Sequence, residues 1–226
     1  MLPSSASASP SGGVAPATVT VWGQGGAGRI EILLDAPAGT PRGVALVAHP
    51  QPLLGGSARH KVPHVLAHAL RDQGWIAWRP NFRGVGGSEG THDHGAGETE
   101  DLLALVAQAR AAHPGLPLAL LGFSFGAYVQ SHVAARIAAA GEPARHVLLA
   151  GMPVGPVQDW RSYDPAPVPG AWLVHGELDE RASLAALMGW AREHAQPLFV
   201  VPGADHFFTG RLQLLREFVA ALAGAG

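Results

Sequence analysis

The sequence predicts an α/β fold in which helices flank a mainly parallel sheet. Short apolar runs without alternation are typical of strands buried on both faces. Amphipathic helical stretches separate these runs, and an alternation of strand and helix predicts parallel strands joined by right-handed crossovers. The chain has 226 residues, 47% of them hydrophobic and 14% charged, which suits one such domain with a sizeable core.

Taken in chain order, two β-rich runs around a glycine-rich turn predict an antiparallel hairpin at one edge of the sheet, over 18–22 and 29–34. The remaining predicted strands are 43–49, 75–79, 116–122, 146–150, 171–175 and 197–201. The predicted helices are 62–73, 101–112, 125–140, 184–194 and 212–222. In the last helix an apolar face supports the assignment, formed by Leu215, Phe218, Val219 and Leu222.

Composition excludes several classes of function. Residues 1–16 are rich in Ser, Ala, Pro and Gly and predict a flexible tail, which leaves 17–226 as the domain. No apolar stretch reaches the roughly 18 residues of a membrane span, so we expect a cytoplasmic protein. A net charge of −2 gives no reason to expect nucleic acid or a membrane as partner, and the lack of cysteine excludes thiolate chemistry.

The segment 122–126 reads GFSFG, a G-x-S-x-G motif placed between a predicted strand and a predicted helix. A sharp turn there would lift the Ser124 hydroxyl clear of the sheet, and the helix that follows would direct free N–H groups towards developing negative charge. This placement is typical of the nucleophile turn in the α/β-hydrolase fold. We therefore interpret Ser124 as a nucleophile.

A serine nucleophile needs a base and an acid that orients the base, and in this fold they follow in the order Ser, Asp or Glu, His. Asp179 comes just after the strand predicted at 171–175, and we prefer it to its neighbours Glu177 and Glu180. His206 lies between the last predicted strand and the last predicted helix, where the base is required.

An acyl transfer also needs two N–H donors for the oxyanion. We expect them to be the backbone amides of Phe125 and Gln51, the latter in a proline-stiffened loop. Three further side chains are expected to face the substrate: Leu54, Met152 and Trp160.

Cofactor and metal sites are not expected. Helical spacing places three histidines on one face of a predicted helix, and we interpret them as a helix face rather than a metal site: His60, His64 and His68.

Four strings of sequence resemble those of small bacterial α/β-hydrolases without a lid, which are serine hydrolases similar to carboxylesterases and distantly to dienelactone hydrolases. The strings are HPQPLLGG at 49–56, NFRGVGGSEG at 81–90, GFSFG at 122–126 and GADHFF at 203–208. The resemblance covers roughly residues 30–222 and implies a sheet of about eight strands, no large cap domain and a triad at Ser124, Asp179 and His206. One departure is Gln51, where the family usually has the second histidine of His-Pro-His-Pro.

The expected function is hydrolysis of a small or accessible carboxylic ester through an acyl-enzyme, with a small-molecule acyl substrate as partner. The segment 151–169 is too short for a helical cap, which favours an open site. Two alternatives stay open: acyl transfer or thioester hydrolysis on the same triad, and a non-catalytic binding module on a hydrolase scaffold.

Overall fold

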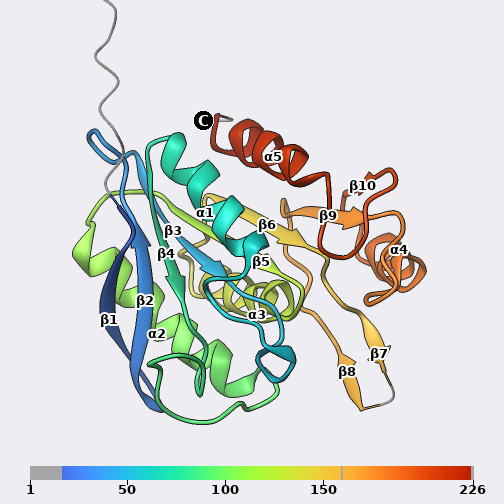
Figure 1. Ribbon diagram of the computed structural model, residues 1–226, viewed down its shortest axis with the longest axis horizontal. Helices are drawn as coiled ribbons and strands as arrows, with labels where there is room; N and C mark the ends of the chain where they lie inside the picture. The colour runs from blue at the N-terminus through green and yellow to red at the C-terminus, as the bar shows by residue number, and fades with distance from the viewer. Residues whose placement is uncertain (1–16, 159, 225–226) are drawn as a thin grey trace, which may run out of the picture.

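The computed structural model describes residues 17–158 and 160–224. This part of the chain contains an eight-stranded sheet in the order β1-β2-β4-β3-β5-β6-β9-β10 (Figure 1). The strands are β1 (Val19–Gly25), β2 (Gly28–Asp35), β3 (Gly43–Ala48), β4 (Trp75–Pro80), β5 (Leu118–Phe123), β6 (His146–Ala150), β9 (Trp172–Gly176) and β10 (Leu198–Val201). The pairs β1–β2 and β2–β4 are antiparallel and the other neighbours are parallel. The predicted edge hairpin and parallel sheet are therefore present.

Helices cover both faces of the sheet (Figure 1). They are α1 (Lys61–Asp72), α2 (Ala96–Ala112), α3 (Phe125–Ala139), α4 (Leu184–Glu193) and α5 (Leu212–Gly224). One core cluster joins the sheet to α2, α3 and α4, and a second joins it to α1 and α5. The alternating strand faces feed these two cores: on β5, Leu120 belongs to the first cluster and Leu121 to the second. This explains the unbroken apolar runs of the sequence.

Helix α2 begins at Ala96, five residues before the predicted start at 101. The reason is Glu98, a fully buried side chain whose carboxylate accepts hydrogen bonds from the N–H groups of Gly95 (2.9 Å) and Asp93 (3.0 Å). This cap ties the glycine-containing stretch before 101 to the helix and so extends the helix towards the N-terminus.

Two small elements were not predicted. The strands β7 (Gly155–Val157) and β8 (Arg161–Tyr163) form an antiparallel hairpin that projects from the main sheet (Figure 1). A short 3₁₀ helix, η1 (Pro52–Leu54), follows β3. The tail predicted at 1–16 lies outside the described residues. No helix in the described part of the chain is both long and apolar enough to cross a membrane.

A buried ion pair joins β2 to β4, its antiparallel neighbour in the sheet. Arg79 Nε donates to Asp35 Oδ2 at 2.8 Å, and the two side chains are 2% and 0% exposed. Arg79 Nη1 also donates to the Ala58 carbonyl at 2.9 Å. The pair therefore ties β2, β4 and the loop before α1 together.

We expect Arg79→Met to lower the free energy of unfolding by about 3–5 kcal/mol, because it leaves the Asp35 carboxylate buried without its cationic partner. Urea denaturation measures the change. The matched control is Arg216→Gln, which breaks the half-exposed ion pair with Asp72 and should cost less than about 1 kcal/mol. Equal costs for the two variants would contradict the assignment.

Candidate active site

Ser124 occupies a strained turn between β5 and α3. Its backbone has φ 56° and ψ −122°, a left-handed conformation that is costly for a residue with a Cβ. Its N–H donates to the Ala150 carbonyl at 2.9 Å, which holds the turn against β6. A Cβ on Gly126 would lie 2.5 Å from the carbonyl oxygens of Ala48 and His49, so only glycine permits this approach of α3 to β3.

The structure brings the three predicted side chains together at the carboxyl edge of the sheet. Ser124 Oγ lies 3.0 Å from His206 Nε2, and His206 Nδ1 lies 2.6 Å from Asp179 Oδ2. They come from three separate loops, after β5, β9 and β10. Parallel strands end at the same edge, so residues far apart in sequence meet there.

Asp179 is held by backbone donors as well as by His206. Its Oδ1 accepts hydrogen bonds from the N–H groups of Arg181 (2.9 Å) and Ala182 (2.8 Å). Burial alone would raise the pKa of Asp179, but the hydrogen bond and positive charge of His206 and the Ala182 N–H outweigh it and leave this pKa below its usual value. The carboxyl group therefore stays ionised next to the imidazole.

The two alternative acids lie elsewhere. Glu177 accepts a hydrogen bond from the Gly203 N–H at 2.8 Å, and Glu180 is exposed. Asp205, next to His206 in sequence, accepts a hydrogen bond from the Thr209 N–H at 2.8 Å.

His175 is a neighbour of this group that sequence reasoning missed. It is fully buried on β9, its Nε2 lies 3.0 Å from the Ala182 carbonyl and 3.3 Å from Asp179 Oδ2. Burial lowers its pKa, which favours the neutral ring. In sequence it falls inside an apolar strand, where nothing distinguishes it from a core residue.

The two predicted oxyanion donors lie beside Ser124. Phe125 is the first residue of α3, and Gln51 follows β3, the strand next to β5. In the described part of the chain neither amide N–H has a hydrogen-bond acceptor. Both donors are therefore available to a ligand.

The loop that carries Gln51 is fixed from two sides. His49 Nε2 accepts from the Phe82 N–H at 3.0 Å, so the proton is assigned to Nδ1, which donates to the Pro50 carbonyl at 2.7 Å. The Gln51 side chain accepts from the Leu53 N–H (3.3 Å) through Oε1 and donates from Nε2 to the Tyr163 hydroxyl (3.2 Å). These bonds position the backbone of Gln51.

A cavity of about 160 Å³ opens at Ser124 and His206. Leu54 lines it as expected, but Met152 is fully buried in the core and Trp160, 49% exposed, lies outside the lining. Both expectations are corrected: Met152, which follows β6 after Gly151, has its side chain in the core cluster shared with α2, α3 and α4. The hairpin β7–β8 instead supplies four lining residues, Val157, Gln158, Arg161 and Tyr163.

The three histidines of the predicted helix face have separate surroundings. His60 caps α1, its Nδ1 accepting from the Val62 N–H at 3.4 Å, and its ring lines the cavity. The rings of His64 and His68 are tilted by 46° with their centroids 3.8 Å apart, and His68 Nε2 lies 3.2 Å from Asp35 Oδ1. Among the described residues no group of three or more His, Asp or Glu side chains could hold a metal ion.

Comparisons with known proteins agree with this fold. The family model of the serine aminopeptidases S33 matches residues 53–179. An uncharacterised protein of Rickettsia prowazekii, RP471, is 32% identical over 198 residues, which are 83% of this chain and 81% of that protein.

Solved structures give the same result. XC6422 of Xanthomonas campestris, an α/β serine hydrolase without a lid, is 32% identical, with a TM-score of 0.78 over 90% of this chain and 92% of that one. An α/β serine hydrolase homologue of Coxiella burnetii is also 32% identical, with a TM-score of 0.79 over 92% and 99%. The fold and this site thus define an α/β serine hydrolase without a lid. The chain belongs to the serine aminopeptidase S33 family of hydrolases.

His49 predicts a loss of stability in acid. Burial lowers its pKa from 6.5 to about 3 in the folded chain. Below pH 6.5 the unfolded chain therefore binds a proton that the folded chain does not, and the free energy of unfolding falls as the pH falls from 6.5 towards 3. This one group contributes a slope that approaches about 1.4 kcal/mol per pH unit.

Urea unfolding between pH 7 and pH 5 tests this expectation. His49→Asn removes the titrating group, and we expect this less stable variant to lose stability less steeply with acid than the wild type. A variant with the same slope as the wild type would show that His49 is not the source.

Proposed function

We propose that this hydrolase cleaves a small carboxylic ester through an acyl-enzyme formed on Ser124. One observation carries the proposal: an unbroken chain of close contacts runs from Ser124 Oγ through His206 to Asp179 at the wall of a cavity. A serine hydroxyl becomes an effective nucleophile when an oriented imidazole can take its proton.

The first step of the mechanism forms the acyl-enzyme. Ser124 Oγ attacks the ester carbonyl while His206 Nε2 takes the hydroxyl proton, and ionised Asp179 stabilises the imidazolium through Nδ1–H. The tetrahedral oxyanion accepts hydrogen bonds from the amides of Gln51 and Phe125. The C–O bond then breaks, and His206 returns its proton to the departing alkoxide, which leaves as the alcohol.

The second step releases the acid. Water attacks the acyl carbonyl, His206 takes a proton from it, and the same two amides hold the second oxyanion. The C–Oγ bond breaks and Ser124 recovers its proton from His206.

Ester cleavage is favoured over aminopeptidase activity by the charge of the cavity. An aminopeptidase must bind a protonated amino terminus, for which a carboxylate is the natural partner. Among the described residues that line the cavity none is Asp or Glu, whereas two, Arg161 and Arg181, are cationic. A cationic lining disfavours an ammonium group.

Substitution of the three side chains tests the proposal with short p-nitrophenyl esters and a fluorophosphonate label. We expect Ser124→Ala and His206→Gln each to lower kcat by about 10⁶-fold and Asp179→Asn by about 10⁴-fold. Labelling should vanish in Ser124→Ala. The control Ser162→Ala, at an exposed serine of β8, should keep both turnover and labelling. Turnover or labelling retained in Ser124→Ala would refute the assignment of the nucleophile.

A pair of substitutions at Gln51 tests the oxyanion donor. Gln51 has φ −51°, close to the angle that proline requires, so Gln51→Pro removes the N–H without a large change of φ. Gln51→Ala removes the same side-chain bonds but keeps the N–H. We expect kcat of the proline variant to be about 10²–10³-fold below that of the alanine variant. Equal kcat values in two folded variants would exclude this amide as a donor.

A further inference from the structure

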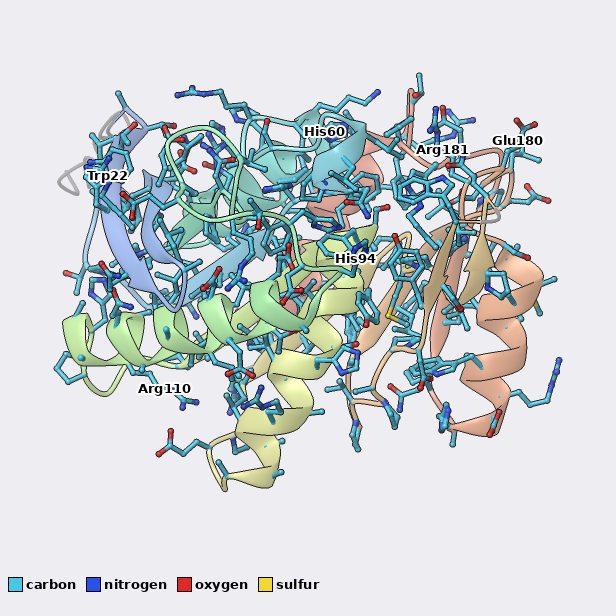
Figure 2. The ribbon with its side chains drawn as sticks, turned by 90° about the horizontal axis from the view of Figure 1, so that it is seen from below. Trp22, His60, His94, Arg110, Glu180 and Arg181 are labelled. Carbon is cyan, nitrogen blue, oxygen red and sulfur yellow. The ribbon has the colours of Figure 1, made fainter. Side chains whose placement is uncertain are left out.

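The cavity beside Ser124 has a cationic character that ester cleavage alone does not require. Arg161, on β8, and Arg181, after β9, both line it. Figure 2 shows Arg181 on the same side of the molecule as His60, another lining residue. The whole chain carries a net charge of −2, so this local excess of positive charge is not a consequence of composition.

Arg161 is held in place by neutral groups. Nη2 donates to Gln158 Oε1 at 2.7 Å, and Nη1 lies 3.4 Å from the Tyr163 hydroxyl. The guanidinium carbon lies 4.2 Å from the centroid of the Trp160 ring. Its Nε is buried and has no hydrogen-bond partner within the described residues. Arg161 also forms no ion pair with any residue of 17–158 or 160–224, so within this part of the chain its charge has no anionic partner.

A second cationic region lies on the side of His206. The ring of Phe207, a lining residue, has Arg181 at 5.0 Å and Lys61, the only lysine of the chain, at 5.5 Å from its centroid. Within residues 17–158 and 160–224 neither cation forms an ion pair, although Glu180 is next to Arg181 in sequence. Arg161 and Arg181 thus present positive charge to two sides of the cavity, whereas Lys61 lies outside its lining and interacts with the Asp205 carboxylate.

We propose that the substrate is an ester that carries a carboxylate, such as the monoester of an aliphatic dicarboxylic acid. This inference rests on the proposed function of Ser124. A guanidinium binds a carboxylate through two parallel hydrogen bonds, and the interaction strengthens in a cavity that is partly shielded from water. A neutral ester would leave the guanidinium groups without an anionic partner.

Matched esters test the inference. Monomethyl adipate carries the carboxylate, and methyl adipamate replaces it with a neutral amide of the same shape. We expect the wild type to favour monomethyl adipate by about tenfold or more in kcat/KM, the value of one charge-assisted hydrogen bond. The preference should decrease as salt is added. Monomethyl esters of the shorter and longer diacids locate the best distance between ester and carboxylate.

Arginine variants assign the preference to the cavity. Arg161→Gln and Arg181→Gln should each reduce the ratio of the two kcat/KM values to a few-fold, and Arg161→Lys should keep part of it because the charge remains. The control is Arg145→Gln, at the opposite end of the sheet before β6, which should retain the wild-type ratio. The ratio is internal to each variant, so a general loss of activity does not affect it.

Binding to Ser124→Ala, measured by calorimetry, separates this inference from the proposed function. Tighter binding of monomethyl adipate than of methyl adipamate supports the anion site whether or not the wild type cleaves either ester. Equal binding refutes the anion site. Cleavage of both esters with equal kcat/KM by the wild type and equal binding to Ser124→Ala, with cleavage abolished in that variant, would refute the anion site and leave the esterase in place. Carboxylate preference in binding without any cleavage or fluorophosphonate labelling would refute the esterase instead.

Discussion

The site depends on one close backbone approach, between the start of α3 and the end of β3. Gly126 lies against the carbonyl oxygens of Ala48 and His49, and this contact sets the turn that places Ser124 at the sheet edge. A left-handed serine costs about 1–3 kcal/mol, which hydrogen bonds of the turn offset: Ser124 N–H to Ala150, and Ala127 N–H to the Ser124 carbonyl, both at 2.9 Å. Because β3 and β5 are neighbours, the same approach brings the loop of Gln51 beside the nucleophile.

The other half of the site repeats this construction at β9 and β10, which β6 separates from β5 in the sheet. A Cβ on Gly176 would lie 2.5 Å from the Ala204 carbonyl, so the loops after β9 and β10 are in close contact. Leu178 N–H donates to that carbonyl at 2.9 Å. Asp179 and His206 therefore stand on two loops that support each other, and the 2.6 Å contact between their side chains needs no movement of the sheet.

The sequence predicted the features that depend on hydrophobic periodicity and on the order of motifs along the chain. The buried strands and the G-x-S-x-G turn have local signals, and the order Ser, Asp, His then located residues that the structure brings into contact. The start of α2 was missed because it depends on the burial of Glu98. The hairpin β7–β8 was missed because strands of three residues are too short for a periodic pattern. Trp160 was misplaced with the hairpin, since it lies in the turn between β7 and β8. Met152 was misplaced because nothing in the sequence shows that its side chain is buried in the core.

The hairpin β7–β8 also joins Arg161 to the loop that carries Gln51. The Tyr163 hydroxyl lies 3.2 Å from Gln51 Nε2 and 3.4 Å from Arg161 Nη1. An anion bound to Arg161 would therefore affect the Tyr163 hydroxyl, which accepts a hydrogen bond from the side chain of Gln51. Binding energy from a remote part of a substrate raises kcat only where it improves contacts made in the transition state. If the proposed carboxylate binds Arg161, it would support, through Tyr163 and the Gln51 side chain, the loop whose amide is the proposed oxyanion donor.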